Sequence, residues 1–200
     1  MQNELNKVRF SVKSLKSNDN KVVELARTVG IHPLAYQELP YDPEYSFYAG
    51  RLNPEVLSHA TADEMYWKVR QEVIFRHTGE HPYEISGPDA EKLLQKIFTR
   101  DISKVKVGRC SYQFACYNDG GMLTDGVLLK LEENKFWFVQ ADGDLFSWYK
   151  AHTDNLNVKI SDPDVWVSQI QGPKSMDLLK ILSKETFPDN WKYFDWKEIT

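Results

Sequence analysis

The sequence predicts an α+β fold, an antiparallel meander of strands with packed helices, and three observations carry this prediction. One is an internal repeat in which a strand, a Gly-Pro pair and a helix follow one another twice, at 83–94 and 168–179. Another is a run of three strands joined by short polar turns. The third is an amphipathic helix directly after that run. Helices laid against antiparallel strands define the α+β class.

The two copies of the repeat have the same residues between their strand and their helix. Each contains a Gly-Pro pair at the same offset, between an apolar strand and a helix. Proline is tolerated at the first helical position because its missing N–H would have no partner there, and glycine permits a sharp entry. We therefore expect two related strand–Gly-Pro–helix units that face each other, and not a solenoid, which needs more copies.

Apolar and polar residues alternate in three segments between the two copies, at 109–117, 122–131 and 135–141. Turns at 118–121 and 132–134 separate these segments, with the diglycine of the first turn typical of a hairpin connection. The three segments are predicted to form consecutive antiparallel strands.

A helix and two short strands follow the meander. Asp142 is placed to cap the helix, because its side chain can accept a hydrogen bond from the first free backbone N–H groups, and the helix is expected to run to about His152. Apolar segments at 157–160 and 165–170 are predicted as strands.

The amino-terminal part is polar and irregular. A helix is expected near 22–29, and residues 39–54 have the composition of an ordered, aromatic-rich loop. A second helix is expected over 62–72, with an apolar stripe that should pack into the core. That stripe consists of Met65, Tyr66, Val69 and Val73. We therefore divide the chain into an irregular extension with an aromatic loop, residues 1–60, and a main domain, residues 61–200.

Composition excludes several classes of function. The chain has 200 residues with 42% hydrophobic content and a net charge of −4, which argues against nucleic-acid binding because phosphate recognition needs a basic surface. No stretch of residues marks a basic patch. No apolar run approaches the ~20 residues that span a bilayer, and no signal-peptide core is present. The chain is accordingly expected to be cytoplasmic, without a membrane partner.

Neither the cysteines nor the histidines have the spacing of a metal site. Cys110 and Cys116 lie on one predicted strand, too far apart for a comfortable disulfide and without the spacing of zinc ligands. We expect both to be reduced and half-buried. His77 and His81 could bracket a metal on a helix, but Gly79 between them argues against a helix. No metal is expected.

Asp125 is the most informative single residue. It follows the diglycine turn on a strand where alternation places Leu123, Val127 and Leu129 on the same face, and this segment is apolar enough to be core. A carboxylate in such surroundings must be paired, protonated or directed at a ligand cavity. Gly126 beside it allows another backbone or a ligand to approach closely. The alternatives are a functional site, or a satisfied carboxylate at a strand end or bulge.

An ordered series of motifs resembles one known family. The series is Ile85-Ser86-Gly87-Pro88-Asp89-Ala90, Thr99-Arg100-Asp101-Ile102, Gly108-Arg109-Cys110-Ser111-Tyr112, Gly120-Gly121-Met122-Leu123-Thr124-Asp125, Phe136-Trp137-Phe138-Val139-Gln140-Ala141-Asp142 and Gln171-Gly172-Pro173-Lys174-Ser175. In this order the motifs resemble the folate-binding aminomethyltransferase superfamily, whose type member is the glycine-cleavage T-protein. They look closer to its tetrahydrofolate-dependent demethylase branch, which includes dimethylsulfoniopropionate demethylase. The likeness covers roughly residues 66–200.

The resemblance implies that residues 61–200 form an aminomethyltransferase folate-binding domain, with tetrahydrofolate in a central cavity between two α+β subdomains. It also implies that this fold is incomplete at its carboxyl end, because the family's pterin-gripping glutamate would fall beyond Thr200.

The resemblance further assigns roles to individual residues. Asp125 falls on the family's catalytic aspartate, close to the folate nitrogen that exchanges the one-carbon unit. The implied cofactor-binding residues are Tyr112, Val127, Gln140, Asp142 and Tyr193. Gln140 stands where the family has asparagine, and Thr124 where it has the first of two aspartates. Residues 76–79 read Arg-His-Thr-Gly in place of the T-protein's Asp-x-Ser-His, which disfavours an aminomethyl-lipoyl substrate.

The function that follows is a tetrahydrofolate-dependent methyltransferase, or demethylase, that moves a methyl group from a small methylated sulfur, oxygen or nitrogen compound to folate. Three alternatives remain. The chain could carry out the glycine-cleavage aminomethyl transfer, it could be a non-catalytic folate-binding module for iron–sulfur assembly or RNA modification, or it could fold without binding a ligand.

Overall fold

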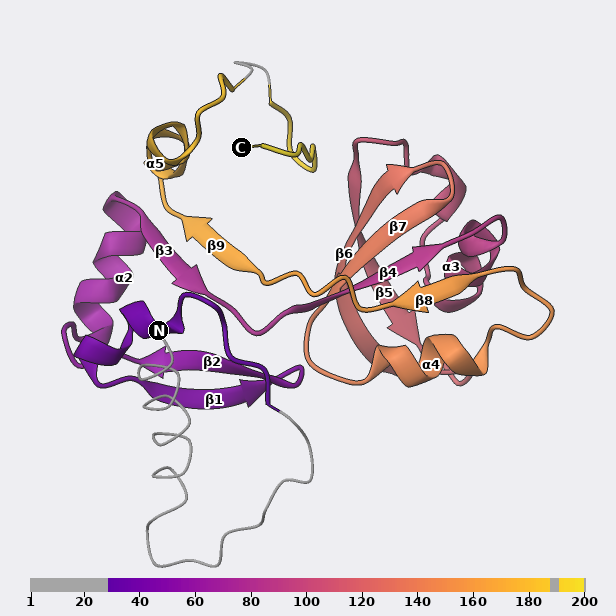
Figure 1. Ribbon diagram of the computed structural model, residues 1–200, viewed down its shortest axis with the longest axis horizontal. Helices are drawn as coiled ribbons and strands as arrows, with labels where there is room; N and C mark the ends of the chain where they lie inside the picture. The colour runs from indigo at the N-terminus through magenta and orange to yellow at the C-terminus, as the bar shows by residue number, and fades with distance from the viewer. Residues whose placement is uncertain (1–28, 188–190, 200) are drawn as a thin grey trace, which may run out of the picture. The chain divides into compact units, whose positions relative to one another are not determined.

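The computed structural model describes residues 29–187 and 191–199, which form two compact units (Figure 1). The first unit comprises the described residues up to Gly79 together with Ser168–Ser175, and the second comprises the remainder. The helix expected at 22–29 lies outside the described residues except for Val29. The domain boundary expected after residue 60 stays a prediction.

The first unit contains two small antiparallel sheets, in which β1 pairs with β2 and β3 pairs with β9. Its elements are η1 (Ala35–Gln37), η2 (Leu39–Tyr41), β1 (Glu44–Tyr48), β2 (Arg51–Val56), α2 (Ala62–Gln71), β3 (Ile74–His77) and β9 (Ser168–Gln171).

The loop expected over 39–54 is instead one short 3₁₀ turn, η2, followed by the β1–β2 hairpin, so that prediction was wrong. The hairpin turn is formed by Ala49 and Gly50, whose φ angles are 49° and 81°. Positive φ at both central residues matches the twist of the flanking strands. Alanine rarely adopts this conformation, and hairpin turns of this type usually have Asn-Gly or Asp-Gly instead. The Ala-Gly pair therefore did not indicate a turn in the sequence.

Helix α2 has the expected position but not the expected packing. Thr61 caps it, accepting from the Glu64 backbone N–H at 3.2 Å, and the Glu64 side chain accepts from the Thr61 backbone N–H at 2.7 Å. None of its residues is buried, and Tyr66 and Trp67 are 55% and 49% exposed. The expected core stripe was therefore wrong. A two-stranded sheet offers too little apolar surface to cover a helix face.

The second unit is built on one five-stranded sheet in the order β5-β6-β7-β4-β8. Its elements are β4 (His81–Ser86), α3 (Ala90–Ile97), η3 (Ile102–Lys104), β5 (Cys110–Cys116), β6 (Met122–Glu132), β7 (Lys135–Gln140), α4 (Leu145–Ala151) and β8 (Lys159–Ser161), with α5 (Ser175–Leu182) beginning at the boundary. Adjacent strands of this sheet are antiparallel. The predicted meander and the α+β class are thus confirmed.

The core of the second unit lies between the sheet and the helices α3 and α4. Its largest fully buried side chains include Leu93 and Leu94 from α3, Tyr149 from α4, and Phe136 and Phe138 from β7. Burying such side chains contributes about 1.5–3 kcal/mol each. This layer holds the sheet rigidly from one side.

The two copies of the repeat have the same local geometry. Gly87 and Gly172 both adopt a left-handed backbone, with φ of 122° and 128°. A Cβ added at Gly87 would lie 2.6 Å from the Asn157 carbonyl oxygen, and one added at Gly172 would lie 2.3 Å from that of Glu72. Only glycine allows this close approach, so both glycines are structural requirements of the unit.

Helix α4 begins two residues later than the sequence indicated. Asp144, and not Asp142, is its N-cap, with the Asp144 carboxylate accepting from the Ser147 backbone N–H at 3.2 Å. Asp142 instead accepts from the Gly143 backbone N–H at 2.9 Å, within the turn before the helix. Two aspartates spaced by one glycine offered two cap positions, and the geometry of the turn selects the second.

Candidate functional site

The five-stranded sheet has one face in the core and one face that is only half-buried. Along β5, β6 and β7 buried positions alternate with half-buried positions, as the pleat of a strand requires. The core helices α3 and α4 pack on the buried positions. We call the other side the open face, and its side chains include Cys110, Tyr112, Phe114, Asp125, Val127, Leu129, Trp137 and Val139.

Asp125 lies on the open face and is paired with Tyr112. Asp125 is opposite Phe114 and Tyr112 is opposite Val127, so the two polar residues are diagonal neighbours on adjacent strands. The Tyr112 hydroxyl donates to the Asp125 carboxylate, and the Tyr112 ring meets Phe114 edge-on with centroids 5.3 Å apart. The carboxylate is therefore paired, one of the outcomes predicted for it, and its partner is a phenol.

The side chains of β6 that face the core are those that alternate with Asp125 and Val127 along the strand. Thr124 and Leu128 are 4% and 0% exposed, whereas Asp125 and its neighbours on the open face are half-buried. The segment does contribute to the core, as its apolar composition indicated, but through the face opposite Asp125, because α3 and α4 pack there. Gly126 is approached by backbone, since a Cβ there would lie 2.2 Å from the Val139 carbonyl oxygen.

Apolar and aromatic side chains surround the Asp125–Tyr112 pair. Val127 stands between its cross-strand partners Tyr112 and Val139. Trp137 lies two residues from Val139 on the same face of β7, and its indole N–H donates to a Glu84 carboxylate oxygen at 3.0 Å. A half-buried, mostly apolar surface with a carboxylate–phenol pair suits a flat heterocycle that carries polar groups on its edge.

Trp137 and Phe114 were missed as candidate site residues. They share the period-two alternation of Asp125 and Tyr112 on paired strands, and cross-strand partners in an antiparallel sheet point to the same side. Combining the strand alternation with the register of the hairpins is the signal that identifies them.

The structure brings Tyr112, Asp125 and Val127 together but places the other three candidates elsewhere. Gln140 is 1% exposed on the core side of the sheet, and its amide nitrogen donates to the Gly143 carbonyl at 2.8 Å. Asp142 is exposed in the turn before α4. Tyr193 is 83% exposed in the carboxyl-terminal segment. Their assignment as cofactor-binding residues stays a prediction.

A second polar cluster lies in the first unit, and we call it the histidine chain. Its members are Leu34, His32, Ser168, His77 and Glu38. The Leu34 backbone N–H donates to His32 Nδ1 at 3.1 Å, so neutral His32 carries its proton on Nε2, which lies 3.3 Å from the Ser168 hydroxyl. That hydroxyl is 3.3 Å from His77 Nδ1, and His77 Nε2 is 3.5 Å from a Glu38 carboxylate oxygen.

Burial keeps both imidazoles of the histidine chain neutral. The two rings stack with centroids 3.8 Å apart, and both residues are less than a tenth exposed. Burial, with nearby His77 and Arg51, lowers the pKa of His32 to about 4, and burial also lowers the pKa of His77. Burial raises the pKa of Glu38. The histidine chain, with its two neutral imidazoles, joins β9 to the amino-terminal turns of this unit.

The two cysteines are free and half-buried, as expected. Burial raises the pKa of the Cys110 thiol to about 11.

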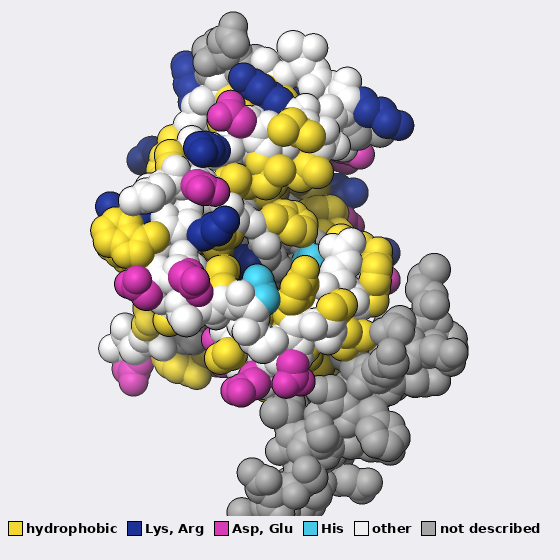
Figure 2. Space-filling model, turned by 90° about the vertical axis from the view of Figure 1, so that its left-hand side faces the viewer, with side chains coloured by type: hydrophobic (Ala, Val, Ile, Leu, Met, Phe, Trp, Pro, Cys, Tyr) yellow, Lys and Arg dark blue, Asp and Glu magenta, His cyan; other side chains and the backbone are white. Residues whose placement is uncertain are grey.

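Many apolar side chains are exposed on the first unit, including Phe47, Tyr66 and Phe75. Figure 2 shows hydrophobic side chains over much of the side of the molecule that it presents. Within residues 29–187 and 191–199, no helix is long and apolar enough to cross a membrane.

Comparison with known proteins finds a demethylase, an aldolase and several aminomethyltransferases among the relatives. The dimethylsulfoniopropionate demethylase DmdA of Ruegeria pomeroyi is 32% identical over 157 residues, which is 78% of this chain and 43% of the relative. The trimethylamine-oxide aldolase of the same organism is 33% identical over 62% of this chain and 16% of its own length. The aminomethyltransferase of Bacillus subtilis is 33% identical over 54% of this chain and 30% of its own length. The chain thus spans less than half the length of these relatives.

A solved structure has the same fold. The glycine cleavage system aminomethyltransferase T from Bartonella henselae matches 76% of this chain with a TM-score of 0.68 and 17% identity, and the match covers 43% of that protein. The family model described as the GCVT N-terminal domain matches residues 31–200. Because this match takes in more than half of the chain, the protein belongs to the GCVT N-terminal domain family.

Proposed function

We propose that this chain binds tetrahydrofolate on the open face and takes part in one-carbon transfer to it, as a demethylase of a small methylated compound. The observation that carries the proposal is the Asp125–Tyr112 pair on a half-buried aromatic face. The whole protein's reaction and substrate are part of the proposal, because the matched relatives are longer than this chain.

The side chains of the open face fit the chemistry of a folate. The pterin and aminobenzoyl rings are flat and apolar on their faces, and Tyr112, Phe114 and Trp137 offer flat surfaces of the same kind. Transfer of a methyl group requires the reacting atoms to be held in line about 3–3.5 Å apart. A carboxylate next to the folate amine can orient it and stabilise positive charge that develops there or on a sulfonium donor.

Two features favour a demethylase over an aminomethyltransferase. The relative that matches over 78% of the chain is a dimethylsulfoniopropionate demethylase, and residues 76–79 depart from the T-protein motif. A second candidate is aminomethyl transfer from a lipoyl carrier, which the several aminomethyltransferase relatives favour.

A donor assay separates the two reactions. The chain is incubated with tetrahydrofolate and either dimethylsulfoniopropionate or an aminomethyl-lipoyl carrier, and the folate products are separated by chromatography. We expect 5-methyltetrahydrofolate from the sulfonium donor, lowered about 10²-fold or more in Asp125→Asn. Asp119→Asn in the exposed turn of the same hairpin is the matched control and should leave the rate unchanged.

The proposal fails in a recognisable way. If folate binds but none of a panel of small methylated sulfur, oxygen and nitrogen compounds transfers its methyl group, the demethylase assignment is wrong. If the Asp125→Asn rate equals that of the unsubstituted chain, Asp125 has a structural role only.

A further inference from the structure

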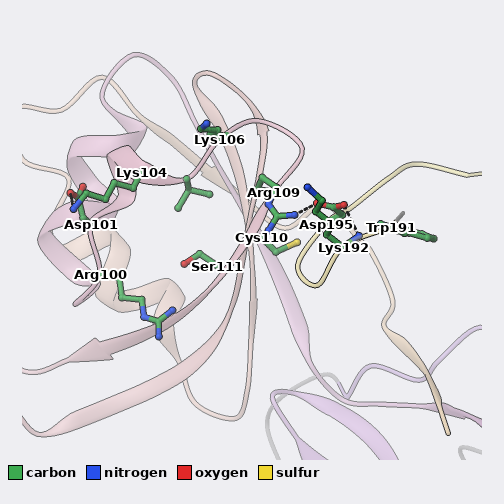
Figure 3. Close-up of a pocket in the computed structure, with 11 residues that line it drawn as sticks. Arg100, Asp101, Lys104, Lys106, Arg109, Cys110, Ser111, Trp191, Lys192 and Asp195 are labelled. Carbon is green, nitrogen blue, oxygen red and sulfur yellow. Dashed lines mark hydrogen bonds and ion pairs between the residues drawn. The ribbon is translucent and has the colours of Figure 1, made fainter. Parts of the chain in front are cut away.

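The second unit carries a basic groove at the amino-terminal end of β5, which we call the β5 groove (Figure 3). The groove has a volume of about 960 Å³. Its cationic lining residues are Arg100, Lys104, Lys106, Arg109 and Lys192, and its carboxylates are Asp101 and Asp195.

Two of these cations are neutralised within the groove. Lys104 lies 3.1 Å from the Asp101 carboxylate. Arg109 forms an ion pair with Asp195, and its other guanidinium nitrogen donates to the Tyr193 carbonyl at 3.0 Å. Both carboxylates of the groove are thereby used.

The other three cations, Arg100, Lys106 and Lys192, form no ion pair with a residue in the described ranges 29–187 and 191–199. The groove is therefore positive in a chain whose net charge is −4. The sequence did not mark this patch, because its cations alternate with apolar and acidic residues over 100–109 and are completed by Lys192 from far along the chain. Figure 3 shows the three side chains around different parts of the groove.

The carboxyl-terminal wall of the groove is attached to the sheet by several hydrogen bonds. The Cys110 backbone N–H donates to the Phe194 carbonyl at 2.8 Å, and the Trp196 indole N–H donates to the Lys130 carbonyl at 3.0 Å. These bonds hold Lys192 beside β5, so the positive wall belongs to the folded unit.

The groove meets the open face at one residue, Cys110, and its lining also includes Ser111 from the core side of β5. Cys110 lines the groove and also belongs to the open face, and Tyr112 is two residues further along the same strand. Asp125 is paired opposite Phe114, four residues from Cys110, which corresponds to about 13 Å along an extended strand. A long ligand that contacts Asp125 and Tyr112 with one end can therefore reach the groove along β5.

Building on the proposed function, we infer that the β5 groove binds the glutamate tail of the folate, a flexible chain of γ-linked carboxylates. In a folate, the glutamates follow one aminobenzoyl ring beyond the nitrogens that carry the one-carbon unit. With those nitrogens at Asp125, the aminobenzoyl ring runs along β5 and the carboxylates enter the groove. Cations on long, exposed side chains suit several mobile carboxylates better than one fixed ion.

Calorimetric titration of the 200-residue chain with tetrahydrofolate monoglutamate and pentaglutamate tests this inference. At low salt the pentaglutamate should bind about tenfold more tightly, because each exposed ion pair changes affinity by a small factor and three cations are free. In Arg100→Gln/Lys106→Gln this advantage should fall to about twofold or less, with the monoglutamate affinity changed by less than about twofold. Raising the ionic strength should reduce the advantage in the unsubstituted chain.

Lys150→Gln/Lys159→Gln is the matched control. It removes the same charge from exposed residues on α4 and on β8, at the far edge of the same sheet from β5. The control should keep the full advantage of the pentaglutamate. An advantage that disappears equally in both variants would reflect net charge and would overturn the inference.

Penta-γ-glutamate without the pterin separates this inference from the proposed function. If the monoglutamate binds and the pentaglutamate has no advantage, the groove does not bind the tail and the proposed function stands. If neither folate binds, the proposed function fails. The tail inference then also fails unless penta-γ-glutamate alone binds the chain and loses affinity in Arg100→Gln/Lys106→Gln.

Discussion

The histidine chain makes the stability of the first unit depend on pH through His32. Its imidazole accepts the Leu34 backbone N–H at Nδ1, so a proton added there removes a hydrogen bond and places a charge beside Arg51. His32 is 6% exposed and its pKa is lowered to about 4. In the unfolded chain this pKa returns to about 6.5.

The sign and size of the effect follow from this difference. The unfolded chain binds the proton more tightly, so the contribution of His32 is complete above pH 6.5 and is lost as the pH falls towards 4. At pH 5 the loss relative to pH 8 is about 2 kcal/mol. The lowered pKa of His77 adds in the same direction, whereas the raised pKa of Glu38 opposes it at acidic pH.

Proton NMR titration of the imidazole C2–H resonances measures this pKa directly, with the His32 signal assigned by its absence in His32→Gln. We expect a midpoint near 4 for His32. Urea unfolding at pH 8 and pH 5 should also show a smaller loss of stability in His32→Gln than in the unsubstituted chain. A His32 midpoint near 6.5 would refute the reasoning, because it would mean that the ring is solvated or finds an anionic partner.

Three further predictions follow from packing and burial. Gly126→Ala should destabilise the second unit by about 1–3 kcal/mol in urea unfolding, because its Cβ would lie 2.2 Å from a β7 carbonyl oxygen. Gly121→Ala should cost less, because its Cβ would meet only the side chains of Asp119 and Tyr117. Leu93→Ala in α3 should cost about 2–5 kcal/mol, and Leu178→Ala, at the matching, half-buried position of α5, clearly less; equal losses would contradict the burial. The Cys110 thiol, with its pKa raised to about 11, should react slowly with iodoacetamide at pH 8, and rapid alkylation in the folded chain would contradict this.

The fold of the second unit could be predicted because its signals are local. Strand alternation, diglycine and Glu-Asn turns, and the Gly-Pro pairs all act within a few residues, and they correctly indicated β5, β6, β7 and both copies of the repeat. The β1–β2 hairpin could not be read in the same way. Its turn depends on a positive φ at Ala49, and alanine does not indicate such a conformation in a sequence.

The candidate site was predictable only in part, because a face of a sheet depends on what packs against it. Alternation correctly grouped Asp125 with Val127, but it could not say that α3 and α4 would cover the other face. Gln140 differs from Val139 by one position, and that step moves its side chain to the core side of the sheet. The β5 groove depends on a tertiary contact between Arg109 and Asp195, which no local pattern reveals.

Calorimetric titration of the chain with tetrahydrofolate, compared between the unsubstituted protein and Tyr112→Ala, is the most direct test of the open face as a folate site. Tyr117→Ala, which removes a 46%-exposed ring just beyond the end of β5, is the control. We expect one folate per chain, an affinity at least about tenfold weaker in Tyr112→Ala, and an unchanged affinity in Tyr117→Ala. Absence of binding, or equal affinities in all three proteins, would contradict it.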